Sequence, residues 1–236
     1  MRIFIIRHGD PDYQTDSLTL RGRREAEALA AYIERLQLTH IYCSPLGRAQ
    51  QTCRPCAEKL GLPVETLSWT RELTGVYYEL DGFGRFSPFF TPGEVMYSIS
   101  PTPRYAGWQN QKYFDDPRYY PQVKEMQAGS DALLARHGYV HEGALYKIER
   151  PSEDRIAVFC HQGLGTTWIS YLLNIPYQAA WAGMWQACTG ITCIRMECRS
   201  TRFSVPRMLY MGDTTHIELA GLEKTERGLS ASMTAC

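Results

Sequence analysis

Arg2-Ile3-Phe4-Ile5-Ile6-Arg7-His8-Gly9 is the stretch of sequence that decides the fold. Its apolar run is continuous rather than alternating, which is typical of a parallel strand buried on both faces. Ligands of open α/β sheets bind beyond the carboxyl ends of the strands. The stretch therefore predicts a buried strand over residues 2–7, with polar candidate site residues directly after it.

Two further segments repeat this arrangement. Residues 155–160 form a second continuous apolar run and lead into His161-Gln-Gly163, while residues 40–43 form a short one that leads into Ser44-Pro45. We expect Ser44 to cap a helix that has proline as its first residue, which places Arg48 in the first helical turn. Three strand ends would then bring two guanidinium groups and two imidazole rings to one edge of a sheet.

The order of the remaining elements indicates the fold class. An amphipathic helix is expected over residues 19–37 and a strand over 64–67, followed after a long interval by a helix over 177–186, strands over 191–197 and 203–211, and a short helix after residue 214. This order predicts an α/β fold, a three-layer α/β/α sandwich with a mainly parallel sheet, in one domain over residues 1–236.

Two segments depart from the regular pattern. Residues 74–150 are rich in proline, glycine and closely spaced aromatic residues, and are interpreted as an inserted cap segment that is either a small satellite core or a lid over the site. Residues 223–236 form a polar tail that we expect to be frayed.

The composition excludes several classes of protein. The chain has 25 basic and 25 acidic residues among 236, so no overall charge attracts nucleic acid or a membrane surface. No apolar run is long enough for a signal peptide or a membrane span. Eight cysteines are too few for a disulfide scaffold. We therefore expect a soluble cytoplasmic protein without nucleic-acid or membrane partners; the oligomeric state is left open.

The clustered cationic groups indicate an anionic ligand. Arg7, Arg48, His8 and His161 would repel one another unless an anion lay between them. A phosphate group accepts bidentate hydrogen bonds from arginine, and free backbone N–H groups at a helix amino terminus, here after Gly163-Leu-Gly165, would add donors. The sequence thus predicts a phosphate site that needs no metal and no cofactor.

At this point the sequence resembles the histidine phosphatase (phosphoglycerate-mutase-like) superfamily. The resemblance is carried by an ordered set of motifs over about two thirds of the chain, namely Arg7-His8-Gly9, Leu18-Thr19 with Gly22, Ser44-Pro-Leu-Gly-Arg48-Ala-Gln-Gln-Thr52, Glu72 with Gly75, His161-Gln-Gly163 and Gly212-Asp-Thr-Thr-His216.

The resemblance implies a role for each residue. His8 would attack phosphorus as a neutral ring and become phosphorylated, while Arg7, Arg48 and His161 would bind the transferring phosphoryl group. Glu72 would protonate the leaving alkoxide and then deprotonate the attacking water.

Two assignments within this scheme stay open. Glu79 and Asp81 are alternatives to Glu72, because they follow it in an irregular region. His216 either borders the phosphate site or is a helix-capping or surface histidine.

The departures from the family pattern favour hydrolysis over mutase chemistry. Mutase-like members carry threonine and then asparagine shortly after Arg-His-Gly, where this chain has Pro11 and Tyr13-Gln14, and they have an arginine pair downstream of the acid glutamate that is absent here. The favoured function is hydrolysis of small phosphate monoesters through a phosphohistidine, with a phosphorylated small molecule as the partner.

Three other functions remain as alternatives. They are phosphoglycerate mutase-type phosphoryl transfer, a non-catalytic phospholigand-binding domain, and a redox centre at Cys53-Arg-Pro-Cys56. The cysteine pair is better interpreted as core or surface residues, because it falls within a helix rather than directly after a strand.

Overall fold

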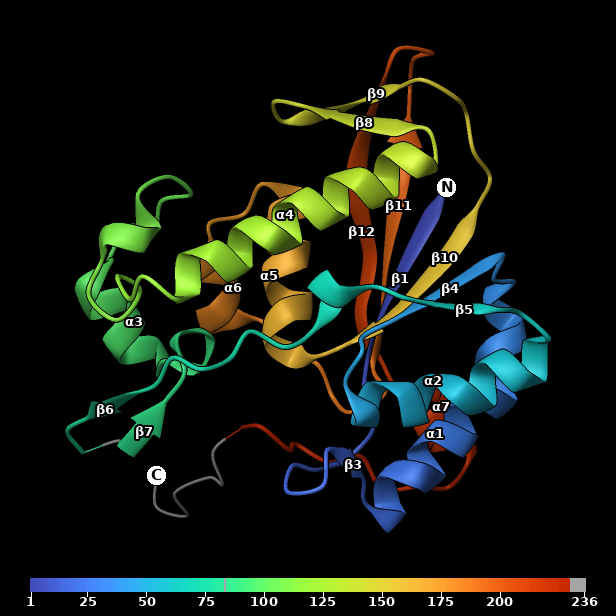
Figure 1. Cartoon of the computed structure of the whole chain (residues 1–236), viewed down its shortest axis with the longest axis horizontal. Coiled ribbons are helices and arrows are strands. Elements are labelled where there is room, and N and C mark those ends of the chain that lie inside the picture. Colours follow the sequence, from blue (N-terminus) through green and yellow to red (C-terminus); the bar gives the residue numbers. More distant parts are fainter. Residues whose placement is uncertain (83, 230–236) are drawn as a thin grey trace.

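An eight-stranded sheet forms the centre of the protein in a computed structural model that describes residues 1–82 and 84–229 (Figure 1). Across the sheet the strands are β5 (Val64–Thr66), β4 (His40–Cys43), β10 (Arg155–Cys160), β1 (Arg2–Arg7), β11 (Ile191–Cys198), β12 (Phe203–Asp213), β9 (Leu145–Ile148) and β8 (Tyr139–Glu142). Two small hairpins pair β2 (Pro11–Asp12) with β3 (Ser17–Leu18) and β6 (Tyr78–Leu80) with β7 (Gly84–Phe86).

The sheet has a parallel half and an antiparallel half. Strands β5, β4, β10 and β1 pair in parallel, whereas β11, β12, β9 and β8 continue the sheet in antiparallel pairs. Each antiparallel pairing reverses the direction, so only β11 and β9 run against β1. The predicted α/β fold with a mainly parallel sheet is confirmed, and the predicted strand ends at His8 and His161 lie in its parallel half.

Helices cover both faces of the sheet. Alternate residues of β1 point to opposite faces: Ile3 and Ile5 pack with α4 and α5, while Phe4 and Ile6 pack with α1 and α2. The helices are α1 (Leu20–Tyr32), α2 (Gly47–Leu60), α3 (Gly93–Ile99), α4 (Tyr119–Arg136), α5 (Gln162–Leu173), α6 (Tyr177–Gly183) and α7 (Thr215–Leu219), and 3₁₀ turns cover Ile33–Leu36, Ser68–Thr70, Pro88–Phe90 and Trp108–Asn110.

The helix ends follow from local chemistry. The Thr19 hydroxyl accepts a hydrogen bond from the Gly22 N–H group, which caps the start of α1. Gly61 ends α2 in the left-handed region at φ 63°, a conformation that costs glycine little. Ser44 was expected to cap α2, but the helix begins later, at Gly47, with Leu46 as an N-cap that makes no side-chain bond. Arg48 nevertheless lies in the first turn.

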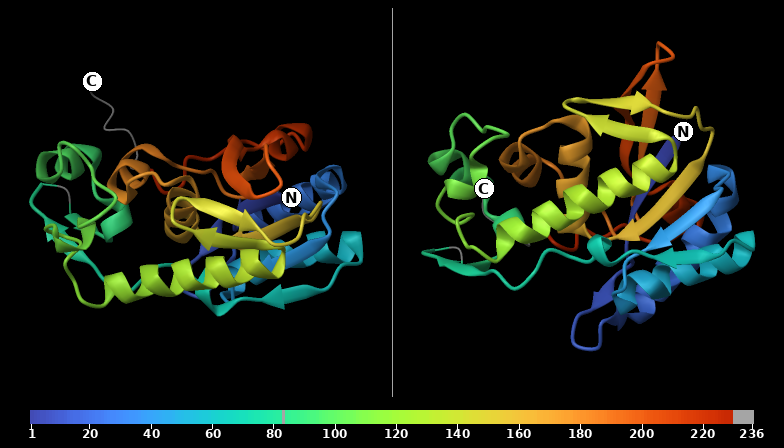
Figure 2. Two further views of the ribbon diagram at one scale, coloured as in Figure 1. Left: turned by 90° about the horizontal axis from the view of Figure 1, so that it is seen from above. Right: turned by 45° about the horizontal axis from the view of Figure 1, so that its top comes forward.

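The segment interpreted as an insertion has two parts. Residues 74–82 and 84–118 lie together at one end of the molecule, around α3 and the β6–β7 hairpin, in all views (Figures 1 and 2). Residues 119–148 instead provide α4 and the sheet strands β8 and β9. The segment is therefore not a single inserted unit, because its second part belongs to the central layers.

No helix within residues 1–82 and 84–229 is both long enough and apolar enough to cross a membrane.

Candidate active site

The two histidines that end the buried strands lie together. Strands β1 and β10 pair in parallel, with Arg7 opposite Cys160, so the residues that follow them are neighbours. The imidazole centroids of His8 and His161 are 5.2 Å apart, and both side chains are almost completely buried. The sequence-predicted pair is thus brought to one point beyond the carboxyl ends of the strands.

His8 is held as a neutral ring in one tautomer. Its Nδ1 lies 2.7 Å from the carbonyl oxygen of Gly9, which can only accept, so Nδ1 carries the proton and Nε2 keeps a free lone pair. Burial holds the pKa of His8 well below its usual range, and the positive charges of Arg7 and Arg48 lower it further. This is the protonation state that a nucleophilic imidazole requires.

His161 joins the site from the start of α5. Its Nε2 lies 2.7 Å from the hydroxyl oxygen of Ser44, and its Nδ1 is buried without a partner among the described residues. Burial lowers the pKa of His161, and His8 and Arg48 lower it further. The hydroxyl that was expected to cap α2 thus orients a histidine instead.

Arg7 is buried and fixed by carbonyl groups. Its Nη1 donates to the backbone oxygen of Gln186 at 2.5 Å and to that of Arg227 at 3.2 Å. Its Nε atom is buried with no partner in the described part of the chain. An unpaired donor on a buried cation is costly unless a ligand uses it, so Arg7 suits an anion.

Arg48 is positioned by Asp16, a residue that the sequence did not single out. One carboxylate oxygen of Asp16 pairs with Arg48 Nη1 at 2.5 Å and the other accepts the Gly47 N–H at 2.7 Å, so Asp16 also supplies an anion to the start of α2. Tyr13 lies against the guanidinium, whose carbon is 5.3 Å from the ring centroid. The Tyr13 side chain is 62% exposed.

Glu72 occupies the helix start that was expected to bind phosphate. Its carboxylate accepts the N–H groups of Gly163 at 3.1 Å and Leu164 at 2.7 Å, as well as that of Leu73 at 3.1 Å. Burial raises the pKa of Glu72, while these three hydrogen bonds lower it, and the net direction is upward. The expectation of free N–H donors after Gly163 is therefore wrong, because the carboxylate has taken them.

The two alternatives to Glu72 lie elsewhere. Glu79 is exposed in β6 and Asp81 is exposed in the turn after it. Among the described residues neither makes a hydrogen bond with the start of α5, whereas the Glu72 carboxylate accepts the N–H groups of Gly163 and Leu164, the second and third residues of that helix. The structure therefore favours Glu72 as the candidate acid.

His216 is connected to the backbone of His8 through Thr189. Its Nε2 lies 2.8 Å from the Thr189 hydroxyl, and the Thr189 N–H donates to the backbone oxygen of His8 at 3.2 Å. His216 is buried, and Thr214 rather than His216 precedes α7, so the surface and helix-capping interpretations are both wrong. Burial lowers the pKa of His216 to about 4.

The carboxyl-terminal tail returns to the site, which sequence reasoning did not predict. The Arg227 guanidinium pairs with Asp10 at 3.1 Å and donates to the Pro11 backbone oxygen at 2.9 Å, while its own backbone oxygen accepts from Arg7. The tail was expected to be frayed, but its described part passes the loop after His8, as Figure 1 shows beside β3. Residues 230–236 lie outside the described residues.

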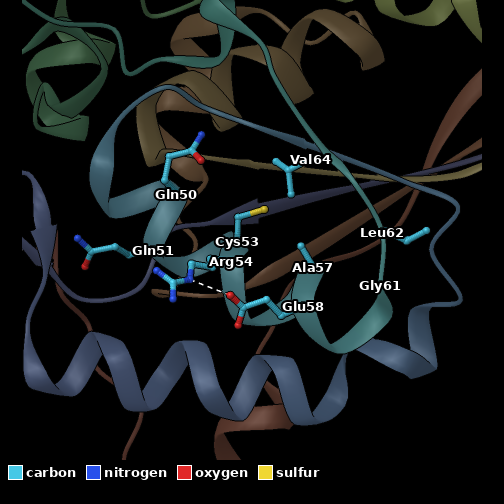
Figure 3. Close-up of a pocket in the computed structure, with 9 residues that line it drawn as sticks. All are labelled: Gln50, Gln51, Cys53, Arg54, Ala57, Glu58, Gly61, Leu62 and Val64. Carbon is cyan, nitrogen blue, oxygen red and sulfur yellow. Dashed lines mark hydrogen bonds and ion pairs between the residues drawn. The ribbon is translucent and has the colours of Figure 1, made fainter.

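The cysteine pair that suggested redox chemistry lies away from this site. Cys53 lines a cavity of about 560 Å³ between α2 and the segment leading into β5, which none of the predicted site residues lines (Figure 3). Both thiols are free and buried, and burial raises the pKa of Cys56. A thiol that stays protonated is a poor nucleophile, so the geometry does not favour the redox alternative.

Comparison with known proteins supports the motif-based resemblance. Residues 3–80 match the model of the histidine phosphatase superfamily (branch 1). The resemblance to this superfamily is confirmed. Over 82 residues the chain is 38% identical to the "Probable phosphoglycerate mutase GpmB" of Yersinia enterocolitica, a match that covers 31% of this chain and 38% of the relative. The match thus spans well under half the length of these curated relatives.

Solved structures resemble nearly the whole chain. A mycobacterial glucosyl-3-phosphoglycerate phosphatase aligns with a TM-score of 0.59 at 21% identity, covering 89% of this chain and 98% of that one. Phosphoserine phosphatase from Entamoeba histolytica, in complex with 3-phosphoglyceric acid, aligns with a TM-score of 0.61 at 19% identity, covering 92% and 98%. At these identities the likeness establishes a shared fold.

Proposed function

We propose that this chain is a metal-independent phosphatase that hydrolyses small phosphate monoesters through a phosphohistidine on His8. The observation that carries the proposal is the neutral His8 ring with a free Nε2 atom. The ring centroid lies 5.2 Å from that of His161, and the charges of the buried Arg7 and Arg48 help to lower the pKa of His8. Four such groups at one edge of a sheet are stable together when a dianion receives their charge and hydrogen bonds.

In the first half-reaction, Nε2 of His8 attacks phosphorus as the bond between phosphorus and the ester oxygen breaks. Arg7, Arg48 and His161 stabilise the charge on the equatorial oxygens. Protonated Glu72 gives its proton to the departing alkoxide, and the raised pKa of this carboxyl group keeps the acid form populated closer to neutral pH.

In the second half-reaction, the Glu72 carboxylate takes a proton from water as the water oxygen attacks phosphorus. The bond between phosphorus and Nε2 breaks, and its electron pair returns to His8. One ester and one water thereby give one alcohol and one phosphate, and Glu72 is protonated again.

Mutase-type phosphoryl transfer is the second candidate, and the names of the matching relatives favour it. A mutase must hold two orientations of a phosphorylated acid and exclude water. Tyr13 stands in the loop where the mutase-like pattern has other residues, and most of this side chain is exposed. The loop after His8, which contains Tyr13, therefore supports hydrolysis better than mutase-type transfer.

The deciding experiment incubates the purified chain with a panel of phosphosugars, phosphorylated acids and nucleotide monophosphates. Inorganic phosphate is measured beside positional isomers of each substrate. We expect stoichiometric phosphate release with alcohol formation and a phosphoenzyme that is stable to alkali and labile to acid. Isomerisation without phosphate release would assign the mutase function instead, and ligand binding without turnover would assign the non-catalytic one.

A further inference from the structure

A second histidine cluster lies at the opposite ends of the same strands. His40 opens β4, His137 follows the last residue of α4, and Asp154 directly precedes β10. One ligand atom from each of the three lies within 4.8 Å of the others. His8 and His161 follow the carboxyl ends of β1 and β10, whereas this trio gathers at the amino ends of β4 and β10, so the phosphate mechanism uses none of it.

Each histidine of the cluster already has a hydroxyl partner on one ring nitrogen. His40 Nδ1 lies 2.9 Å from Thr39 Oγ1, and His137 Nε2 lies 2.9 Å from Tyr42 Oη. Histidines that bind a metal commonly donate their second ring N–H to such an oxygen, which fixes the tautomer. The nitrogens left over are Nε2 of His40 and Nδ1 of His137, and the latter lies 2.7 Å from Asp154 Oδ2.

The charges around the cluster favour a cation. The nearby guanidinium of Arg136 is paired with Glu65 at 2.6 Å. Asp154 Oδ2 lies 2.7 Å from His137 Nδ1, so one carboxyl group stands beside two imidazole rings. Two imidazole nitrogens and one carboxylate oxygen are a ligand set that suits zinc and related transition ions better than magnesium or calcium.

We propose that His40, His137 and Asp154 bind one Zn²⁺ ion or a transition ion of similar preference. The ion takes the place of the single ring proton of His137 at Nδ1, and this same proton moves to Nε2, where it is donated to the Tyr42 hydroxyl oxygen. His40 is exposed, so its ring can rotate to bring Nε2 to the ligand distance of about 2 Å. Water completes the coordination.

Such an ion links three separate parts of the fold, the start of β4, the end of α4 and the entry to β10. Because the site lies away from the phosphate pocket, its role is structural. Zn²⁺ bound to the folded chain and absent from the unfolded chain raises the melting temperature.

The test uses tag-free protein that has been stripped with a chelator and titrated with Zn²⁺ by calorimetry, with melting temperatures recorded in parallel. We expect one binding event in the wild type that raises the melting temperature. His40→Ala should abolish that event and its thermal shift. The matched control is His141→Ala, since His141 also lies beside a carboxylate, Asp131 at 3.2 Å, but has no second histidine; it should bind Zn²⁺ like the wild type.

Tyr42→Phe tests the hydrogen-bonding partner directly. It leaves all three ligands in place and removes only the oxygen that receives the His137 proton, so we expect Zn²⁺ affinity to fall about tenfold. A wild-type chain that binds no Zn²⁺, or a His40→Ala variant with an unchanged binding event, would overturn the proposal. The exposed position of His40 means that its loss does not compromise folding.

Discussion

The two ends of the parallel strands each hold a pair of histidines at nearly the same spacing, yet they suit ligands of opposite charge. The ring centroids are 5.2 Å apart for His8 and His161 and 4.9 Å apart for His40 and His137. At the carboxyl ends the neighbours are arginines, and at the amino ends they are a carboxylate and hydroxyl groups. The comparison teaches that the groups around an imidazole pair, more than the pair itself, decide what it binds.

The largest expected effect separates the two pairs by activity. His8→Ala removes the nucleophile and should lower kcat/KM by about 10³-fold or more, whereas His40→Ala at the other end should leave it unchanged. Initial rates of phosphate release from the best substrate of the panel measure both. Equal losses in the two variants would contradict the distinction.

The next effect tests the acid at the carboxyl-end site. Glu72→Gln should lower turnover of alkyl phosphates by about 10²-fold, and turnover of an aryl phosphate much less, because a phenolate leaves without a proton. The acid must be protonated before attack, so wild-type activity falls as pH rises through the raised pKa of Glu72. That alkaline limb should be absent from the variant. Retention of the limb would assign it to another group.

A smaller effect concerns the tail that returns to the carboxyl-end site. Arg227→Ala removes the pairing with Asp10 that anchors the backbone oxygen contacting Arg7. The guanidinium of this pair is 44% exposed although Asp10 is buried, so the pair is worth about 1 kcal/mol and we expect KM to rise roughly two- to fivefold with kcat unchanged. Arg118→Ala, which breaks an ion pair with Asp116 in the segment before α4, is the matched control and should leave KM as it is.

The smallest effect on activity, and a measurable one on stability, is expected from His216, which contacts Thr189 behind the His8 backbone. Burial lowers the pKa of His216 from 6.5 to about 4 on folding. Between these two pH values His216 is protonated in the unfolded chain and neutral in the folded chain. The free energy of unfolding therefore falls as pH drops below about 6.5, by about 2 kcal/mol at pH 5 for this group. The free energy of unfolding, measured with urea at pH 7 and at pH 5, should fall less in His216→Gln than in the wild type, by about 2 kcal/mol.

The sequence by itself determined the strands and the residues that follow them. A continuous apolar run identifies a buried parallel strand, and the carboxyl ends of neighbouring parallel strands meet at one edge. Those two local rules are enough to bring Arg7, His8 and His161 together, and Arg48 follows because its helix begins just after β4.

Only the tertiary structure decided which groups complete each site. Asp16 reaches Arg48 and Glu72 reaches the start of α5 because loops of irregular path end there, and Arg227 contacts Asp10 across 217 positions of sequence. The trio of His40, His137 and Asp154 comes from three elements joined by the register of β4 with β10 and the packing of α4. The periodicity of apolar residues indicates which face of an element is buried, but it does not indicate which distant residues a loop will contact.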